Sequence, residues 1–152
     1  MGEIKRLIEE ILARGYVMSL GTVDEGGVWV ADVIYIYDTS FNIFWISQIS
    51  TRHSQAIEKN NHIAGTITTS VVGGKNEGLQ IEGTVERVNR PSLEMIAAHF
   101  HKRLGEVPHT MYLNENDELS EPEISWYRLK PIKIELFYEK HYGFNKQVIE
   151  LK

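Results

Sequence analysis

A hydroxyl, a guanidinium and an imidazole follow one another in the first half of the chain, as Thr51, Arg52 and His53. The apolar run Ile43 to Ile46 comes shortly before them and predicts a strand, and Thr51 to about Asn60 predicts a helix. The free N–H groups and the positive dipole end of a helix N-terminus attract phosphate, as do these side chains. The spacing therefore predicts a phosphate site, with a plain threonine helix cap as the simpler alternative.

The composition narrows the class of protein. The 152 residues are 42% hydrophobic and 24% charged, which indicates one globular domain over residues 1–152. The absence of cysteine excludes disulfides and thiolate chemistry. A net charge of -5 argues against broad nucleic-acid binding. No segment approaches the roughly 20 apolar residues of a membrane span, and residues 1–6 do not resemble a signal peptide. We expect a cytoplasmic protein with neither a membrane nor a nucleic-acid partner.

Periodicity predicts the elements that must position Thr51, Arg52 and His53. Apolar residues at helical spacing predict a first helix that Gly15 ends as a C-cap would: Ile4, Leu7, Ile8, Ile11 and Leu12. Strands are predicted at 16–23, 28–37, 41–47, 63–72, 79–88 and 124–138, with a short one at 148–151. A third helix begins at Pro91 and Ser92, with Leu93, Ile96, Ala97 and Phe100 on one face and Gly105 after its end. Residues 106–123 are predicted to form a surface loop.

Short turns between most of these strands favour a mainly β fold, a small antiparallel barrel with three helices inserted. His99 and His101 do not form a metal pair, because residues two apart on a helix point to different faces. We expect both to be exposed or partly buried, and we predict no metal site. Gly73-Gly74-Lys75 lacks the frame of a phosphate loop and predicts a turn.

Four segments in order resemble one known superfamily, the pyridoxamine 5′-phosphate oxidase-like, FMN-binding split barrels. They are Ser47 followed by Thr51-Arg52-His53, the strand 79–85 with its Glu-Gly, the segment 128–137 with its Arg-Leu-x-Pro, and the strand pair 28–38 and 41–47. The patterns at 78–83 and 143–146 are similar to a group of uncharacterised bacterial proteins within that superfamily. The resemblance implies a Greek-key-like split β-barrel.

The same resemblance implies a homodimer with FMN in the cleft between subunits. Thr51 and Arg52 would hold the phosphate, with His53 in the place of a family lysine. Because His53 could titrate near neutral pH, anion affinity would weaken as it deprotonates. The remaining contacts would come from Ser47 to the phosphate or ribityl chain, from the backbone of Asp32, Val33 and Ile34 along the flavin ring, and from Gln80 near its polar edge.

Two departures from the family pattern limit the expected activity. The oxidases carry Arg and Lys where this chain has Val30 and Tyr35, and their C-terminal Arg-x-His pair is missing here. Oxidation of pyridoxamine phosphate is therefore not expected. The favoured function is an FMN-dependent oxidoreductase for an unidentified small molecule, and no catalytic residue is named. The alternatives are a non-catalytic flavin- or haem-binding protein and a cofactor-free dimeric barrel.

Overall fold

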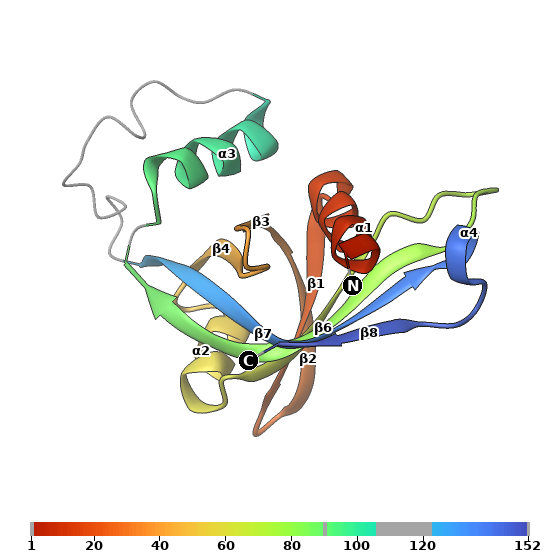
Figure 1. The fold of residues 1–152 in the computed structure, drawn as a ribbon. Coiled ribbons are helices and arrows are strands. Elements are labelled where there is room, and N and C mark those ends of the chain that lie inside the picture. Colours follow the sequence, from red (N-terminus) through yellow and green to blue (C-terminus); the bar gives the residue numbers. More distant parts are fainter. Residues whose placement is uncertain (1, 90, 106–122, 152) are drawn as a thin grey trace.

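The computed structural model describes residues 2–89, 91–105 and 123–151. Within them the elements run along the chain as follows: α1 (Gly2–Arg14), β1 (Val17–Asp24), β2 (Gly27–Ile34), β3 (Ile36–Tyr37), β4 (Ile43–Gln48), α2 (Arg52–Lys59), β5 (His62–Thr68), β6 (Glu77–Val88), α3 (Leu93–Leu104), β7 (Ile124–Tyr138), α4 (Glu139–Tyr142) and β8 (Gln147–Glu150) (Figure 1). The predicted loop 106–123 lies outside the described residues except for Glu123.

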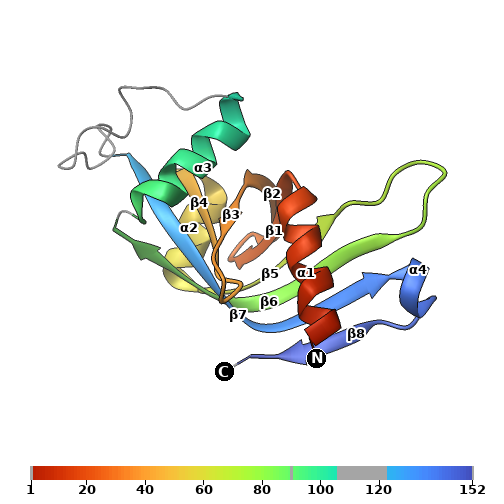
Figure 2. The same ribbon diagram turned by 45° about the horizontal axis from the view of Figure 1, so that its top comes forward.

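The strands form one antiparallel sheet in the order β2-β1-β5-β6-β7-β4-β3, with β8 added on β7. The terminal strands of this order, β2 and β3, are joined through the single residue Tyr35, so the sheet curls back on itself as a half-barrel. Figures 1 and 2 show α1 and α3 against one side of the curled sheet, and α2 next to the C-terminal end of β4. This architecture confirms the mainly β split barrel expected from the sequence.

The predicted strand 28–37 is wrong at Tyr35, where the chain leaves one strand partner and joins another. β2 pairs with β1 as the expected hairpin, whereas β3 pairs with β4. Tyr35 is fully buried, and its hydroxyl donates to the carbonyl oxygen of Leu12 at 2.7 Å. The predicted strand 63–72 is also too long, because β5 ends at Thr68. The short helix α4 was not predicted.

Gly15 ends α1 for a different reason from the one expected. Its φ is not positive, and its N–H continues the helix by donating to the Ile11 carbonyl at 2.8 Å. A Cβ here would lie 2.6 Å from Cγ2 of Ile67 and would also overlap the Tyr35 hydroxyl. Glycine is therefore required by close packing between α1 and the sheet, where Leu7, Ile8, Ile11 and Leu12 enter the main core.

The helix α3 packs on a second, smaller apolar cluster. Ser92 at its start and Gly105 after its end are as predicted: Ser92 caps the helix by accepting from the Met95 N–H, and Gly105 adopts the left-handed conformation at φ 76°. The cluster consists of Ile36, Phe44, Ile96, Phe100 and Trp126. His99 lies beside this cluster and is 2% exposed, contrary to the expected exposed or partly buried position, and its ring is 5.3 Å from that of Trp126. Among the described residues, neither ring nitrogen of His99 has a hydrogen-bond partner.

We predict that His99 makes α3 docking sensitive to acid. Burial, with the nearby charges of Arg103 and Lys102, lowers its pKa from 6.5 to about 4. Between these two pH values the unfolded chain binds a proton that the folded chain does not. The contribution of neutral, buried His99 to the free energy of unfolding is therefore fully present above about pH 6.5 and is lost as the pH falls toward 4. The loss should be on the order of 3 kcal/mol.

Urea denaturation at several pH values checks this, with His99→Phe as the variant that should lack the loss. His101→Gln, on the exposed side of the same helix, is the matched control and should behave like the wild type. Equal pH dependence in the wild type and His99→Phe would contradict the prediction.

Candidate functional site

The end of β4 and the start of α2 bring three of the predicted site residues together. Ser47 lies near the end of β4, and Thr51 is the N-cap of α2, its hydroxyl accepting from the Ser54 N–H at 3.3 Å. Nε2 of His53 lies 2.9 Å from the Ser47 hydroxyl oxygen and 3.4 Å from that of Thr51. The junction is therefore a helix cap and, at the same time, a cluster of polar side chains able to bind an anion.

His53 contributes hydrogen bonding more than charge. Its side chain is buried, and this burial lowers its pKa below the usual value of 6.5. The imidazole is consequently neutral at neutral pH to a greater extent than an exposed histidine would be. Anion affinity should therefore weaken, as His53 loses its proton, at a lower pH than the sequence indicated.

Arg52 is held in place by residues that the sequence reasoning did not connect to it. Its Nε and Nη2 donate to the two carboxylate oxygens of Asp24 at 2.9 and 3.1 Å. Its guanidinium carbon lies 4.5 Å from the centre of the Trp29 ring. The ion pair raises the pKa of Arg52 and lowers that of Asp24. Of the three guanidinium nitrogens, Nη1 takes no part in the bonds to Asp24.

The predicted residues on β2 and β6 lie elsewhere on the sheet. Asp32 faces outward and accepts from the Ser19 hydroxyl at 2.7 Å, and Gln80 accepts from the ammonium of Lys146. Register places Asp32 and Gln80 in one row across the sheet, separated by β1 and β5. Val33 points to the opposite, buried side, and Ile34 is partly buried. The structure thus puts Asp32 and Gln80 on a common face without contact.

This common face, called here the outer sheet face, is hollowed by about 590 Å³. Its lining includes Ser19, Gly21, Val28, Val30, His62, Ala64, Thr66, Gln80, Glu82 and Glu135. Val28 and Val30 are 74% and 59% exposed, around the small residues Gly21 and Ala64. His62, which spacing alone did not single out, reaches the face because alternate residues of β5 point to it, and its Nε2 is 2.7 Å from Glu82.

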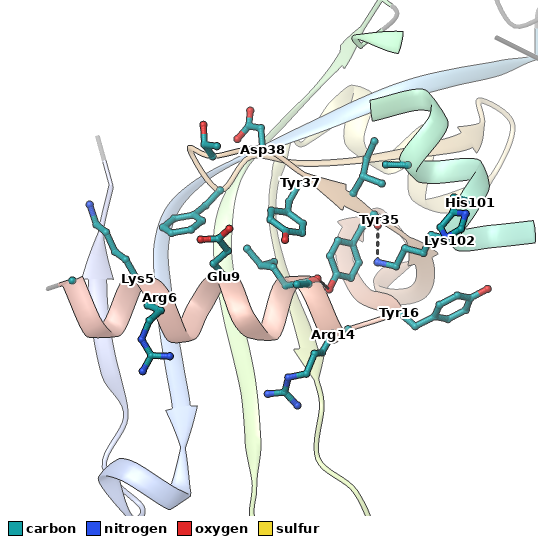
Figure 3. A pocket seen from close by; sticks show the side chains of 18 residues that line it. Lys5, Arg6, Glu9, Arg14, Tyr16, Tyr35, Tyr37, Asp38, His101 and Lys102 are labelled. Atoms are coloured by element: carbon teal, nitrogen blue, oxygen red, sulfur yellow. Dashed lines mark hydrogen bonds between the residues drawn. The ribbon is translucent and has the colours of Figure 1, made fainter. Parts of the chain in front are cut away.

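A larger pocket of about 950 Å³ lies between α1, β3 and α3 and is called here the α1–α3 pocket. Figure 3 shows Tyr35 and Tyr37 between α1 and α3, with Lys102 reaching toward Tyr35. No sequence motif pointed to this pocket, because its walls come from three segments distant in the chain.

Comparison with known proteins identifies the family of the chain. Residues 4–138 match the family described as Pyridoxamine 5′-phosphate oxidase. The chain belongs to this family. It is also similar to the UPF0306 protein YhbP of Escherichia fergusonii, with 26% identity over 102 residues, covering 63% of this chain and 67% of that protein.

Two solved structures illustrate the fold that this family member shares. A protein related to general stress protein 26, of the pyridoxine phosphate oxidase family, from Clostridium acetobutylicum superposes with a TM-score of 0.69 at 16% identity, covering 99% of this chain and 96% of that one. HutZ, the haem storage protein from Vibrio cholerae, superposes with a TM-score of 0.60 at 17% identity, covering 94% and 91%. At these identities the likeness establishes the split-barrel fold.

Two kinds of feature are absent from the residues that the structure describes, 2–89, 91–105 and 123–151. No helix in them is long and apolar enough to cross a membrane. No group of three or more His, Cys, Asp or Glu side chains in them is arranged to hold a metal ion.

Proposed function

We propose that the protein is a homodimeric FMN-binding oxidoreductase acting on a small molecule. The observation that carries the proposal is the cluster of Ser47, Thr51 and His53 at the N-terminus of α2, where Arg52 is the first residue of the helix. Hydroxyl, imidazole and guanidinium donors at a helix N-terminus fit the oxygens of a phosphate ester. Membership of the oxidase family supports FMN as the compound that carries this phosphate.

The proposed cofactor contacts extend from this cluster along β2. Nη1 of Arg52 and the hydroxyls of Thr51 and Ser47 would bind the phosphate, and Gln80 would lie near the polar edge of the ring. β2 is an edge strand in the described sheet, so one side of its backbone, including Asp32 to Ile34, keeps peptide groups that no other strand pairs. When bound, FMN supplies the electron or hydride transfer. The chain's own contribution is to orient the ring and to bind the phosphate.

The outer sheet face supports a second copy of the chain as the partner. Val28 and Val30 are exposed apolar side chains beside Gly21 and Ala64, which have little or no side chain to keep a partner away. Contiguous apolar surface of this kind usually marks an interaction site. In the proposed dimer, two such faces meet and enclose the cofactor.

Replacement of Arg52 by Ala should weaken FMN binding by about 1.5–3 kcal/mol, because a hydrogen bond to a charged group is lost. Quenching of flavin fluorescence during titration measures the dissociation constant. Lys59→Ala removes a cation from the other end of the same helix and should leave the constant unchanged. Equal FMN affinity in the wild type and Arg52→Ala would place the phosphate elsewhere, and absence of FMN binding to the wild type would overturn the proposed function.

Replacement of Val30 by Glu should convert the dimer to a monomer, because the new carboxylate would be buried without a partner in the interface. Analytical ultracentrifugation at micromolar concentration measures the mass of the species. Val72→Glu places the same charge at a fully exposed position outside the outer sheet face and should leave the dimer intact. A wild-type monomer, or a Val30→Glu dimer, would contradict the proposed interface.

A haem-binding function is the second candidate, favoured by the position of His62. Its imidazole lies on the outer sheet face and contacts Glu82, and a carboxylate partner of this kind commonly orients a metal-binding histidine. The structural similarity to HutZ points the same way. On this candidate, added haem gives a Soret shift that His62→Ala removes and the control His141→Ala keeps. FMN binding without a Soret shift would exclude it.

A further inference from the structure

The α1–α3 pocket contains a cation, Lys102, that pairs with no carboxylate in the part of the chain that the structure describes. Nζ of Lys102 donates to the backbone carbonyl oxygen of Tyr35 at 2.7 Å and lies 3.5 Å from the centre of the Tyr35 ring. Among the described residues, no carboxylate lies within 4.0 Å of this ammonium. Lys102 is only partly exposed, and this burial lowers its pKa to about 8. A half-buried ammonium without an anionic partner is electrostatically unfavourable.

Of the other lysines and arginines in the lining, Lys5 is exposed, and both arginines are paired. Arg6 binds Glu10 at 3.3 Å, and Arg14 binds Glu77 at 2.9 Å. Of the two acids in the lining, Asp38 already accepts from the backbone N–H groups of Ser40 and Asn42. Lys102 is therefore the partly buried cation that remains available to an anion entering the pocket.

The ammonium of Lys102 is also fixed in position. The Tyr35 ring beneath it is held by the hydrogen bond from the Tyr35 hydroxyl to the Leu12 carbonyl. Ring and carbonyl thus fix the ammonium from two sides, and Figure 3 shows the side chain within the pocket rather than extended into solvent. A cation fixed in this way loses little side-chain entropy when a ligand binds.

The remaining lining indicates what else the ligand must have. Tyr35, Tyr37 and Phe41 supply aromatic surface, and Leu12 and Ile36 supply aliphatic surface. The volume of about 950 Å³ lies within the range of small-molecule sites. A single half-buried ammonium, with the carboxylate of Glu9 also in the lining, matches one negative charge better than two.

We propose that the α1–α3 pocket binds a small aromatic carboxylate, whose carboxylate group accepts from the ammonium of Lys102 while its ring packs against Tyr37 and Phe41. This site does not depend on the flavin proposal. It uses none of the residues assigned to the FMN phosphate, and it can be tested on protein to which no FMN has been added.

The test compares three probes of one shape, which are 2-naphthoate, the neutral 2-naphthamide and the doubly charged 2-naphthyl phosphate. Binding is followed by calorimetry and by ¹H–¹⁵N correlation spectra. We expect 2-naphthoate to bind best, by about tenfold over the amide, since a charged hydrogen bond is involved. The perturbed amides should include Gly15, Tyr37 and Ala98 from the pocket. Failure of all three probes to bind, equal affinity for the carboxylate and the amide, or shifts centred on Gly21 and Ala64 would overturn the site. Tighter binding of the phosphate would overturn its preference for a single charge.

The variant Lys102→Met keeps an unbranched side chain that is one atom shorter over Tyr35 and removes the charge. It should weaken 2-naphthoate about tenfold and abolish the difference between carboxylate and amide. Arg103→Met is the matched control, because Arg103 is the neighbouring exposed cation on α3 and does not line the pocket. Should Lys102→Met not fold, Lys102→Gln, which can still donate to the Tyr35 carbonyl, replaces it with the same expected losses. Unchanged binding in the folded variant would overturn the role of Lys102.

Discussion

The bend in the long β6–β7 pair is the constraint on which the rest of the structure depends. The register shifts between Glu82, which pairs with Lys133, and Gly83, which pairs with Pro131. A Cβ at Gly83 would overlap the carbonyl oxygen of Lys130, so the two backbones can approach this closely only at glycine. Before the bend β7 pairs with β4, and after it β7 pairs with β8. One bulge therefore lets a single strand serve both halves of the split barrel.

Because the two halves of the sheet separate at this bulge, α2 and the β1–β2 hairpin are connected by an ion pair between Asp24 and Arg52. α2 follows β4, whereas the β1–β2 hairpin lies at the other end of the strand order. Asp24 joins them, because its Oδ1 accepts from the Gly26 N–H in the hairpin turn while both oxygens bind Arg52. The Arg52 side chain is 37% exposed, and an exposed ion pair contributes little to stability because water screens it. The Asp24–Arg52 ion pair is therefore weak enough for the guanidinium to bind a phosphate as well.

Local sequence patterns were enough to predict the structural features that depend only on residues close together in the chain. The cap at Thr51, the cap at Ser92 and the left-handed Gly105 follow from residue type and periodicity, and so does the order of the strands along the chain. The pairing of Arg52 with Asp24 joins residues 28 apart, and the contact of Lys102 with Tyr35 joins residues 67 apart. No local signal encodes such contacts. The strand break at Tyr35 has no local signal either, since it accompanies a change of strand partner from β1 to β4 and a hydrogen bond to Leu12, 23 residues away.

Tyr35 also shows why family membership alone does not define the chemistry of the site. The resemblance to the oxidases places a lysine at this position of the strand, and here the position carries a buried phenol ring. A positive charge nevertheless lies beside it, because Lys102 of α3 brings its ammonium to the Tyr35 carbonyl and over the Tyr35 ring. The cation thus comes from a helix and points into a pocket bounded by α1. Since α3 rests on the small cluster around Trp126 rather than on the main core, the position of this charge depends on how firmly α3 is docked. In this chain the positive charge beside Tyr35 is therefore tied to the docking of one helix, whereas a lysine at position 35 would carry its charge on the chain segment between β2 and β3.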